Sequence, residues 1–75
     1  MHGARYSAFL QRDIDFVNAR AAWTTDQKDV FDHLLKGRLN DIGIMKELHI
    51  GDRKFYRVKR EIDRKIAVIL QENDR

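Results

Sequence analysis

The stretch that decides the fold reads IMKELHIGDRKFYRVKR and runs from Ile44 to Arg60. A short helix, a turn of three or four residues and a basic helix in this order predict a helix-turn-helix. Two helices that meet at an angle need apolar side chains in the space between them. The segment supplies these at Ile44, Leu48, Ile50, Phe55 and Val58. Gly51 and Asp52 are both suitable residue types to begin the second helix, because either type is accepted at an N-cap.

The helix after this turn is predicted to run from Asp52 to about Glu72, which exceeds five turns with no breaker. KIAVIL (65–70) is β-branched enough to suggest a strand, but it continues the helical spacing of Val58 and Ile62, so we expect helix throughout. The last apolar residues of this helix extend beyond what a helix-turn-helix core needs. We expect them to pack on the first helix of the same chain or on a second chain. These residues are Ile62, Ile66, Ile69 and Leu70.

Capping residues mark the helices upstream. In RYSAFLQRDIDFVNARAAW, an amphipathic helix over about 5–21 is predicted by the helical spacing of Tyr6, Phe9, Leu10, Ile14 and Val17. In WTTDQKDVFDHLLKG, Thr24 or Thr25 can cap a second helix, and Thr24 with Gln27 fits a capping box. Gly37 suits the end of this helix, because glycine takes the left-handed conformation without penalty. Asn40 suits the start of the short helix that follows.

Together these segments predict a small all-α domain of about four helices, with a helix-turn-helix and a long C-terminal recognition helix. We expect residues 1–22 to form the N-terminal amphipathic helix and residues 23–75 the helix-turn-helix domain, within a single compact domain. A chain of 75 residues holds one small core and no ligand cavity beside it. With 43% hydrophobic and 36% charged residues, it is globular rather than a disordered tail.

Several classes of function are disfavoured by composition. The sequence has no Cys, hence no disulfide or thiolate metal site, and no apolar run near the roughly 20 residues of a membrane span. We therefore expect a cytoplasmic protein without a membrane partner. No nucleophile triad, phosphate loop or metal set is visible, so we expect no enzyme activity, cofactor or metal. His49 at the turn is expected to tolerate a positive φ. Trp23 is expected to seal an edge of the core.

Positive charge gathers in the last helix. The net charge is +3, but residues 1–50 carry seven Lys or Arg and seven Asp or Glu, which cancel. Residues 53–65 carry seven bases against Glu61 and Asp63, a local charge of +5. Such a segment attracts a polyanion. The same local charge would also fit an ordinary solvated helix face, or a surface that binds an acidic protein.

The decisive stretch also resembles a known pattern. IMKELHIGDRKFYRVKR is similar to I-A-x-x-L-G-I-S-x-x-T-V-Y-R-x-K-R of sigma-factor region four and, more closely, of the ArpU/RinA-type phage late transcription regulators. WTTDQKDVFDHLLKG resembles the LTxxQxxVxxxxxxG first helix of region four. The resemblance covers about residues 23–70 and implies a DNA-binding transcription regulator. Met45, His49 and Gly51 depart from it, where Ala, Gly and Ser are usual.

The outward residues of the last helix are the candidate DNA contacts. Arg53, Lys54 and Arg57 are predicted to reach base edges in the major groove, because Arg and Lys pair with guanine O6 and N7. Other side chains are predicted to contact the DNA backbone, which takes half or more of protein–DNA hydrogen bonds. They are Lys46, Tyr56, Lys59, Arg60 and Arg64.

We therefore expect a sequence-specific transcription regulator of phage type. Double-stranded DNA is its expected partner, and RNA polymerase is a further candidate. A homo-oligomer through Ile62, Ile66, Ile69 and Leu70 is a candidate assembly. Two other readings stay open. One is the DNA-recognition subunit of a phage packaging terminase, and the other is a helical module that binds an acidic protein.

Overall fold

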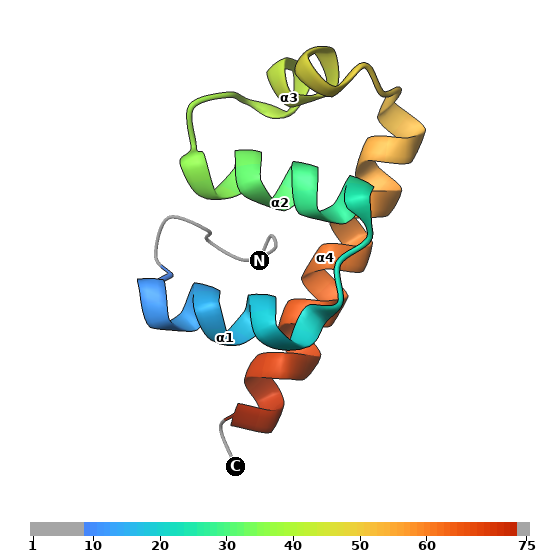
Figure 1. Ribbon diagram of the computed structural model, residues 1–75. Helices are drawn as coiled ribbons and strands as arrows, with labels where there is room; N and C mark the ends of the chain where they lie inside the picture. The colour runs from blue at the N-terminus through green and yellow to red at the C-terminus, as the bar shows by residue number, and fades with distance from the viewer. Residues whose placement is uncertain (1–8, 74–75) are drawn as a thin grey trace.

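Four α-helices make up the part of the chain that the computed structural model describes, residues 9–73 (Figure 1). They are α1 (Gln11–Ala21), α2 (Thr25–Lys36), α3 (Asp41–Leu48) and α4 (Asp52–Asn73). The prediction of a small all-α domain of about four helices is confirmed. The predicted first helix began at about residue 5, so its first residues, Tyr6 among them, lie outside the described residues.

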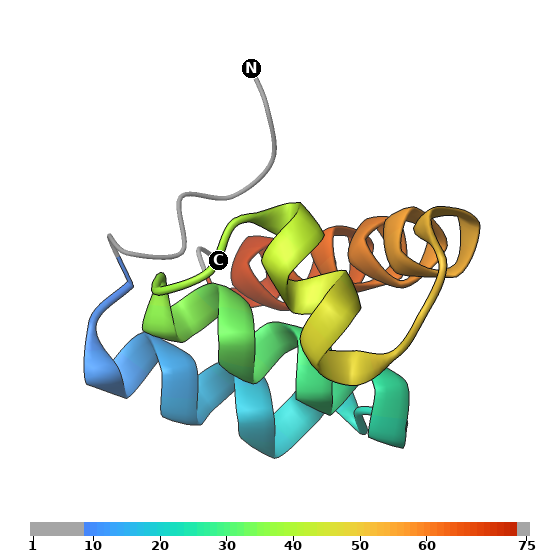
Figure 2. The same cartoon turned by 90° about the horizontal axis from the view of Figure 1, so that it is seen from above.

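The long α4 runs across the other helices. Helices α1 and α2 run in opposite directions, and α4 passes beside both of them. Helix α3 lies on the side of α2 opposite to α1 (Figures 1 and 2). Helix α4 packs against α1 and α2, and α3 packs against α2. Among the described residues, no helix is both long enough and apolar enough to cross a membrane.

A single core forms because α4 turns one apolar face toward all of its neighbours. Its buried residues recur every three or four positions, the spacing of one helix face. They are Phe55, Val58, Ile62, Ile66 and Ile69. The same core takes side chains from each of the other helices, namely Val17 and Ala21 of α1, Val30 and Phe31 of α2, and Ile44 of α3. Since each large apolar side chain contributes about 1.5–3 kcal/mol when fully buried, this face supplies much of the folding free energy.

The last apolar residues of α4 pack within the chain. Ile62, Ile66 and Ile69 are buried, and Leu70 is partly buried against the same core. Of the two alternatives that the sequence left open, packing on the chain itself is therefore the one observed. The surface proposed for a homo-oligomer is therefore largely covered by the chain itself. The segment 65–70 is helical within α4, as the continued spacing predicted.

Leu10 departs from the predicted pattern. It was expected on the apolar face of the first helix, but its exposed fraction is 54%. The helix begins only at Gln11, so Leu10 is the N-cap residue with extended backbone and falls outside the helical spacing. Its backbone N–H donates to Asp13 Oδ2 at 3.2 Å. Phe9 packs against the core at partial burial.

The predicted caps of α2 and α3 are confirmed. Thr24 Oγ1 accepts a hydrogen bond from the Gln27 backbone N–H, and the Thr24 N–H donates to Gln27 Oε1, both at 3.2 Å. Gly37 ends α2 at φ 66°, in the left-handed conformation that favours glycine. Asn40 Oδ1 accepts from the Gly43 N–H at 2.8 Å at the start of α3.

Residues 49–51 join α3 to α4. His49 takes φ 57°, which confirms the expectation that it tolerates a positive φ in this turn. Its N–H donates to the Lys46 carbonyl at 3.3 Å, and the Ile50 N–H donates to the Met45 carbonyl at 3.1 Å. These bonds satisfy carbonyls at the end of α3 that have no partner within the helix. Ile50 packs at partial burial against the core, so the turn is anchored on its apolar side.

We expect Ile62→Val to lower the free energy of unfolding by about 1 kcal/mol, because it removes a methylene group from a fully buried site. Urea unfolding followed by circular dichroism measures this change. Val68→Ala on the exposed side of α4 is the control and should change stability by less than about 0.5 kcal/mol. Equal losses for the two variants would contradict the assignment of the buried face.

Candidate nucleic-acid interface

A row of four arginines occupies the exposed side of α4. We call Arg53, Arg57, Arg60 and Arg64 the arginine stripe, and all four are exposed. Their spacing of four, three and four residues places them along one side of a helix, away from the buried row. At a rise of roughly 1.5 Å per residue, the stripe is about 16 Å long. Four guanidinium groups thus lie in a line along one helix.

The stripe is largely free of internal partners. Arg57 Nε lies 4.0 Å from Glu61 Oε2, the limit of an ion pair, and both side chains are solvent-exposed. In the described part of the chain, the other three arginines have no carboxylate within ion-pair distance. Like charges three or four residues apart on a helix repel one another. The stripe therefore costs some stability in the free protein, and a bound polyanion would relieve this repulsion.

The lysines of the same segment are arranged differently, because each one contacts another part of the fold. Lys54 Nζ lies 3.1 Å from Asp26 Oδ2 of α2. Lys59 Nζ lies 3.3 Å from both carboxylate oxygens of Asp41 of α3 and 5.8 Å from the centre of the Phe55 ring. Among the predicted contacts, Lys54 and Lys59 are thus set apart from the stripe, on the flanks of α4 that face α2 and α3.

Two other predicted backbone contacts remain exposed. Tyr56 lies on α4 with 45% of its surface exposed, and its ring meets the Phe55 ring edge-on at 5.1 Å. That contact fixes the ring while leaving the side chain accessible to solvent. Lys46 lies in the last turn of α3 and is exposed. The structure thus leaves both side chains accessible, Tyr56 on α4 itself and Lys46 on α3.

A buried glutamine connects α2 to α4. Gln27 has an exposed fraction of only 5%, and its Nε2 donates to Glu61 Oε1 at 3.0 Å. Its Oε1 accepts from Lys65 Nζ at 2.7 Å, and Lys65 also donates to the Ala22 carbonyl at 3.2 Å. This network holds α4 at a fixed orientation on α2, and it therefore sets the direction in which the stripe points.

The long-range role of Gln27 was missed in the sequence, where the residue was assigned only to a capping box. Gln27 lies three and four residues before Val30 and Phe31, so it shares their buried face. A polar residue at such a position needs a partner inside the protein. That spacing was the available signal, but it could not identify Glu61 and Lys65 as the partners.

Trp23 closes the edge of the core beside this network. Its Nε1 donates to Asn18 Oδ1 at 2.8 Å, and its ring lies 4.9 Å from the Phe31 ring. Lys65 Nζ lies 5.4 Å from the Trp23 ring. The expectation that Trp23 seals a core edge is therefore confirmed. Within residues 9–73, no group of three or more His, Asp or Glu side chains is placed to hold a metal ion.

No protein-family model, no curated protein and no solved structure was found to match this chain.

We expect Gln27→Ala to lower the free energy of unfolding by about 1–3 kcal/mol, because Glu61 and Lys65 lose a hydrogen-bond partner at a part-buried site. Urea unfolding is again the measurement. Lys28→Ala, one residue along on the exposed side of α2, removes only a surface ion pair with Asp32 and should cost less than about 0.5 kcal/mol. A Gln27→Ala variant as stable as wild type would show that the network does not hold α4.

Proposed function

We propose that the chain is a sequence-specific DNA-binding transcription regulator that reads the major groove with α4. The single observation that carries this proposal is the arginine stripe, four exposed and largely unpaired guanidinium groups in a line on one helix. In this proposal α3, residues 49–51 and α4 act as a helix-turn-helix. The resemblance of Ile44–Arg60 to phage late regulators supports a phage-type regulator.

The shape of the positive surface favours a groove. A major groove about 12 Å wide admits one α-helix, which is about 10–12 Å across with its side chains. Lys54 and Lys59 on the flanks of α4 are paired with Asp26 and Asp41, so their charges are partly neutralised. On the exposed side of α4 the positive charge is thus carried by a strip of arginines one helix wide. A broad basic face would suit a flat acidic surface better.

The roles of the arginines follow from their order along α4. The first turns of a recognition helix enter the groove, so Arg53 and Arg57 are proposed to reach guanine O6 and N7 through their two-pronged guanidinium groups. Arg60 and Arg64 are proposed to contact phosphates, together with Tyr56 of α4 and Lys46 of α3. Lys54 and Lys59, predicted as DNA contacts from sequence, are proposed instead to hold α4 against α2 and α3.

The alternative readings are less well supported. A packaging-terminase subunit would use the same helix for DNA but would also need a surface for assembly, and Ile62, Ile66 and Ile69 are buried within the chain. If the partner were an acidic protein, there would be no reason for all four residues of the stripe to be arginines. Contact with RNA polymerase is proposed from the resemblance only, and no described residue is assigned to it.

We expect the protein to bind random-sequence duplex DNA with an affinity that falls steeply as salt rises, because bound arginines release counterions from phosphates. Arg60→Ala should lower the affinity and reduce the slope of log K against log salt by about 1. Fluorescence anisotropy over a salt series measures both quantities.

Arg12→Ala provides a control with the same loss of charge. Arg12 is exposed in the first turn of α1, and that end of α1 lies away from α4 (Figure 1). We expect this variant to keep the slope of the wild type. Absence of DNA binding at low salt, or equal effects of Arg12→Ala and Arg60→Ala, would rule out the stripe as a DNA contact.

Selection of binding sites from a random pool tests the assignment of base contacts. The wild type should enrich a motif that contains guanine. Arg57→Ala should relax the preference at one position by about 1–3 kcal/mol, because it removes a guanine contact. Arg64→Ala should weaken binding evenly and leave the motif unchanged. If Arg64→Ala alters the motif and Arg57→Ala does not, the two roles are reversed.

A further inference from the structure

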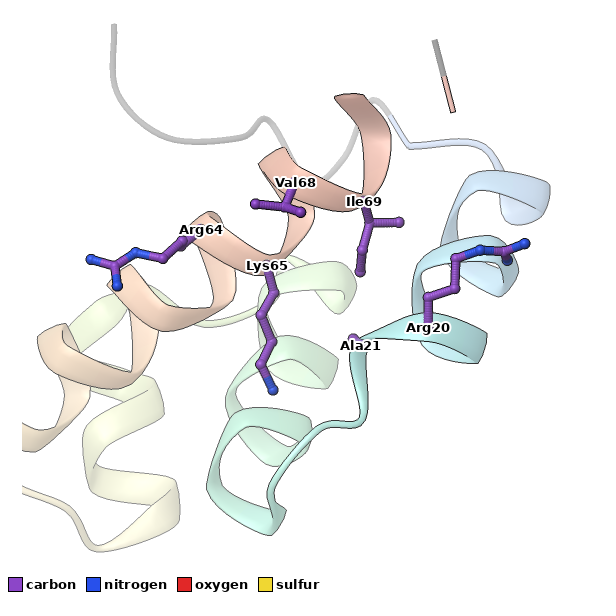
Figure 3. Close-up of a pocket in the computed structure, with 6 residues that line it drawn as sticks. All are labelled: Arg20, Ala21, Arg64, Lys65, Val68 and Ile69. Atoms are coloured by element: carbon purple, nitrogen blue, oxygen red, sulfur yellow. The ribbon is translucent and has the colours of Figure 1, made fainter. Parts of the chain in front are cut away.

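A groove lies between the end of α1 and the C-terminal half of α4, at the far end of α4 from the start of the stripe (Figure 3). Its volume is about 490 Å³, and it is lined by Arg20, Ala21, Arg64, Lys65, Val68 and Ile69. It is open to solvent and mostly apolar. Helix α4 thus changes character along its length, from an exposed row of arginines to an apolar groove wall.

One of the side chains that line the groove is aliphatic and exposed. Val68 is 51% exposed, although it sits on a helix whose other exposed side is strongly charged. Ala21 and Ile69 are buried next to it and complete an apolar strip between the two helices. A single exposed valine is ordinary on a protein surface. Val68, however, lines a groove beside two apolar neighbours, so another apolar side chain could pack against it there.

Two arginines stand at opposite ends of this apolar strip (Figure 3). Arg20 is held in place, because its Cζ lies 3.7 Å from the centre of the Phe16 ring and its Nη1 donates to the Phe16 carbonyl at 3.5 Å. In the described part of the chain, neither Arg20 nor Arg64 has a carboxylate partner. Lys65 points toward the connection between α1 and α2, where its ammonium group is bound by Gln27.

We propose that this groove binds an acidic amphipathic helix of a partner protein. One aliphatic side chain of that helix would lie on Val68 and Ala21, and carboxylates on its two flanks would meet Arg20 and Arg64. The two surfaces are complementary in charge, since an apolar strip between two guanidinium groups without a carboxylate partner fits an apolar ridge between two carboxylates. This inference concerns a second surface, which shares only Arg64 with the stripe, and it does not rest on the proposed binding of DNA.

Other occupants fit the groove less well. A second copy of the chain, placed symmetrically, would bring its own Arg20 and Arg64 into the same space, and the like charges would repel. Duplex DNA would complement the charge of the arginines, but its charged phosphates would then lie against the apolar side chain of Val68. A small molecule would remain largely exposed, because binding sites for small molecules are concave and bury most of their ligand.

The test uses the whole chain, labelled with nitrogen-15, and a synthetic peptide of about four helical turns with leucine on one face and glutamate on both flanks. We expect the peptide to shift the amide signals of Ala21, Val68 and Ile69. Val68→Ser should weaken binding about tenfold, because a valine contact is lost. A peptide of equal charge with serine in place of leucine should show a similar loss.

Three results would overturn the proposal. They are equal binding of the leucine and serine peptides, shifts centred on Arg53 to Arg60, and the absence of any binding at low salt. Concentration-dependent shifts at Val68 without peptide would identify a second copy as the occupant and would overturn it too. Val68→Ser should keep its affinity for duplex DNA, so failure of the groove and failure of DNA binding can be told apart.

Discussion

Burial of the apolar row of α4 against the three other helices holds the domain together, because none of those helices buries enough surface to fold alone. Helix α1 buries Val17 and Ala21 in the core, and α3 buries Ile44, with Met45 and Leu48 partly buried against it. Short helices of this kind are marginal in water unless they pack on a partner. Helix α4 is long enough to give α1 and α2 a partner at different points along its length, and α3 packs in turn on α2.

This arrangement separates the basic residues of α4 into two groups. One side of the helix is committed to the core, so residues on its flanks lie near α2 and α3 and find acidic groups there. Lys54 and Lys59 are in this position, and a flexible ammonium group suits such contacts. The four exposed cations opposite the core have little within the domain to bind, since only Arg57 comes within 4.0 Å of a carboxylate of the described residues, that of Glu61. All four are arginines, whose planar guanidinium groups suit nucleic-acid recognition.

The polar network around Gln27 fixes the orientation of α4 on α2. Apolar packing alone allows some variation in how one helix lies on another, whereas hydrogen bonds have preferred lengths and angles. Gln27 connects to Glu61 and Lys65 at two successive turns of α4, and Lys65 also contacts the end of α1 through the Ala22 carbonyl. The two surfaces proposed for partners, the arginine stripe and the groove beside Val68, are therefore held in a fixed relation on one rigid helix. Arg64 belongs to both.

By itself the sequence determined the helices, their caps and the fold class. Helical spacing and capping depend on residues three or four positions apart, as at Thr24 and Gln27, so they can be read locally. The tertiary structure alone decided which cations of α4 are free and whether Ile62 to Leu70 pack within the chain. Lys59 meets Asp41 across 18 residues, and Gln27 meets Glu61 across 34. Contacts at such separations depend on how the helices cross, and the spacing of residues along one helix carries no information about that crossing.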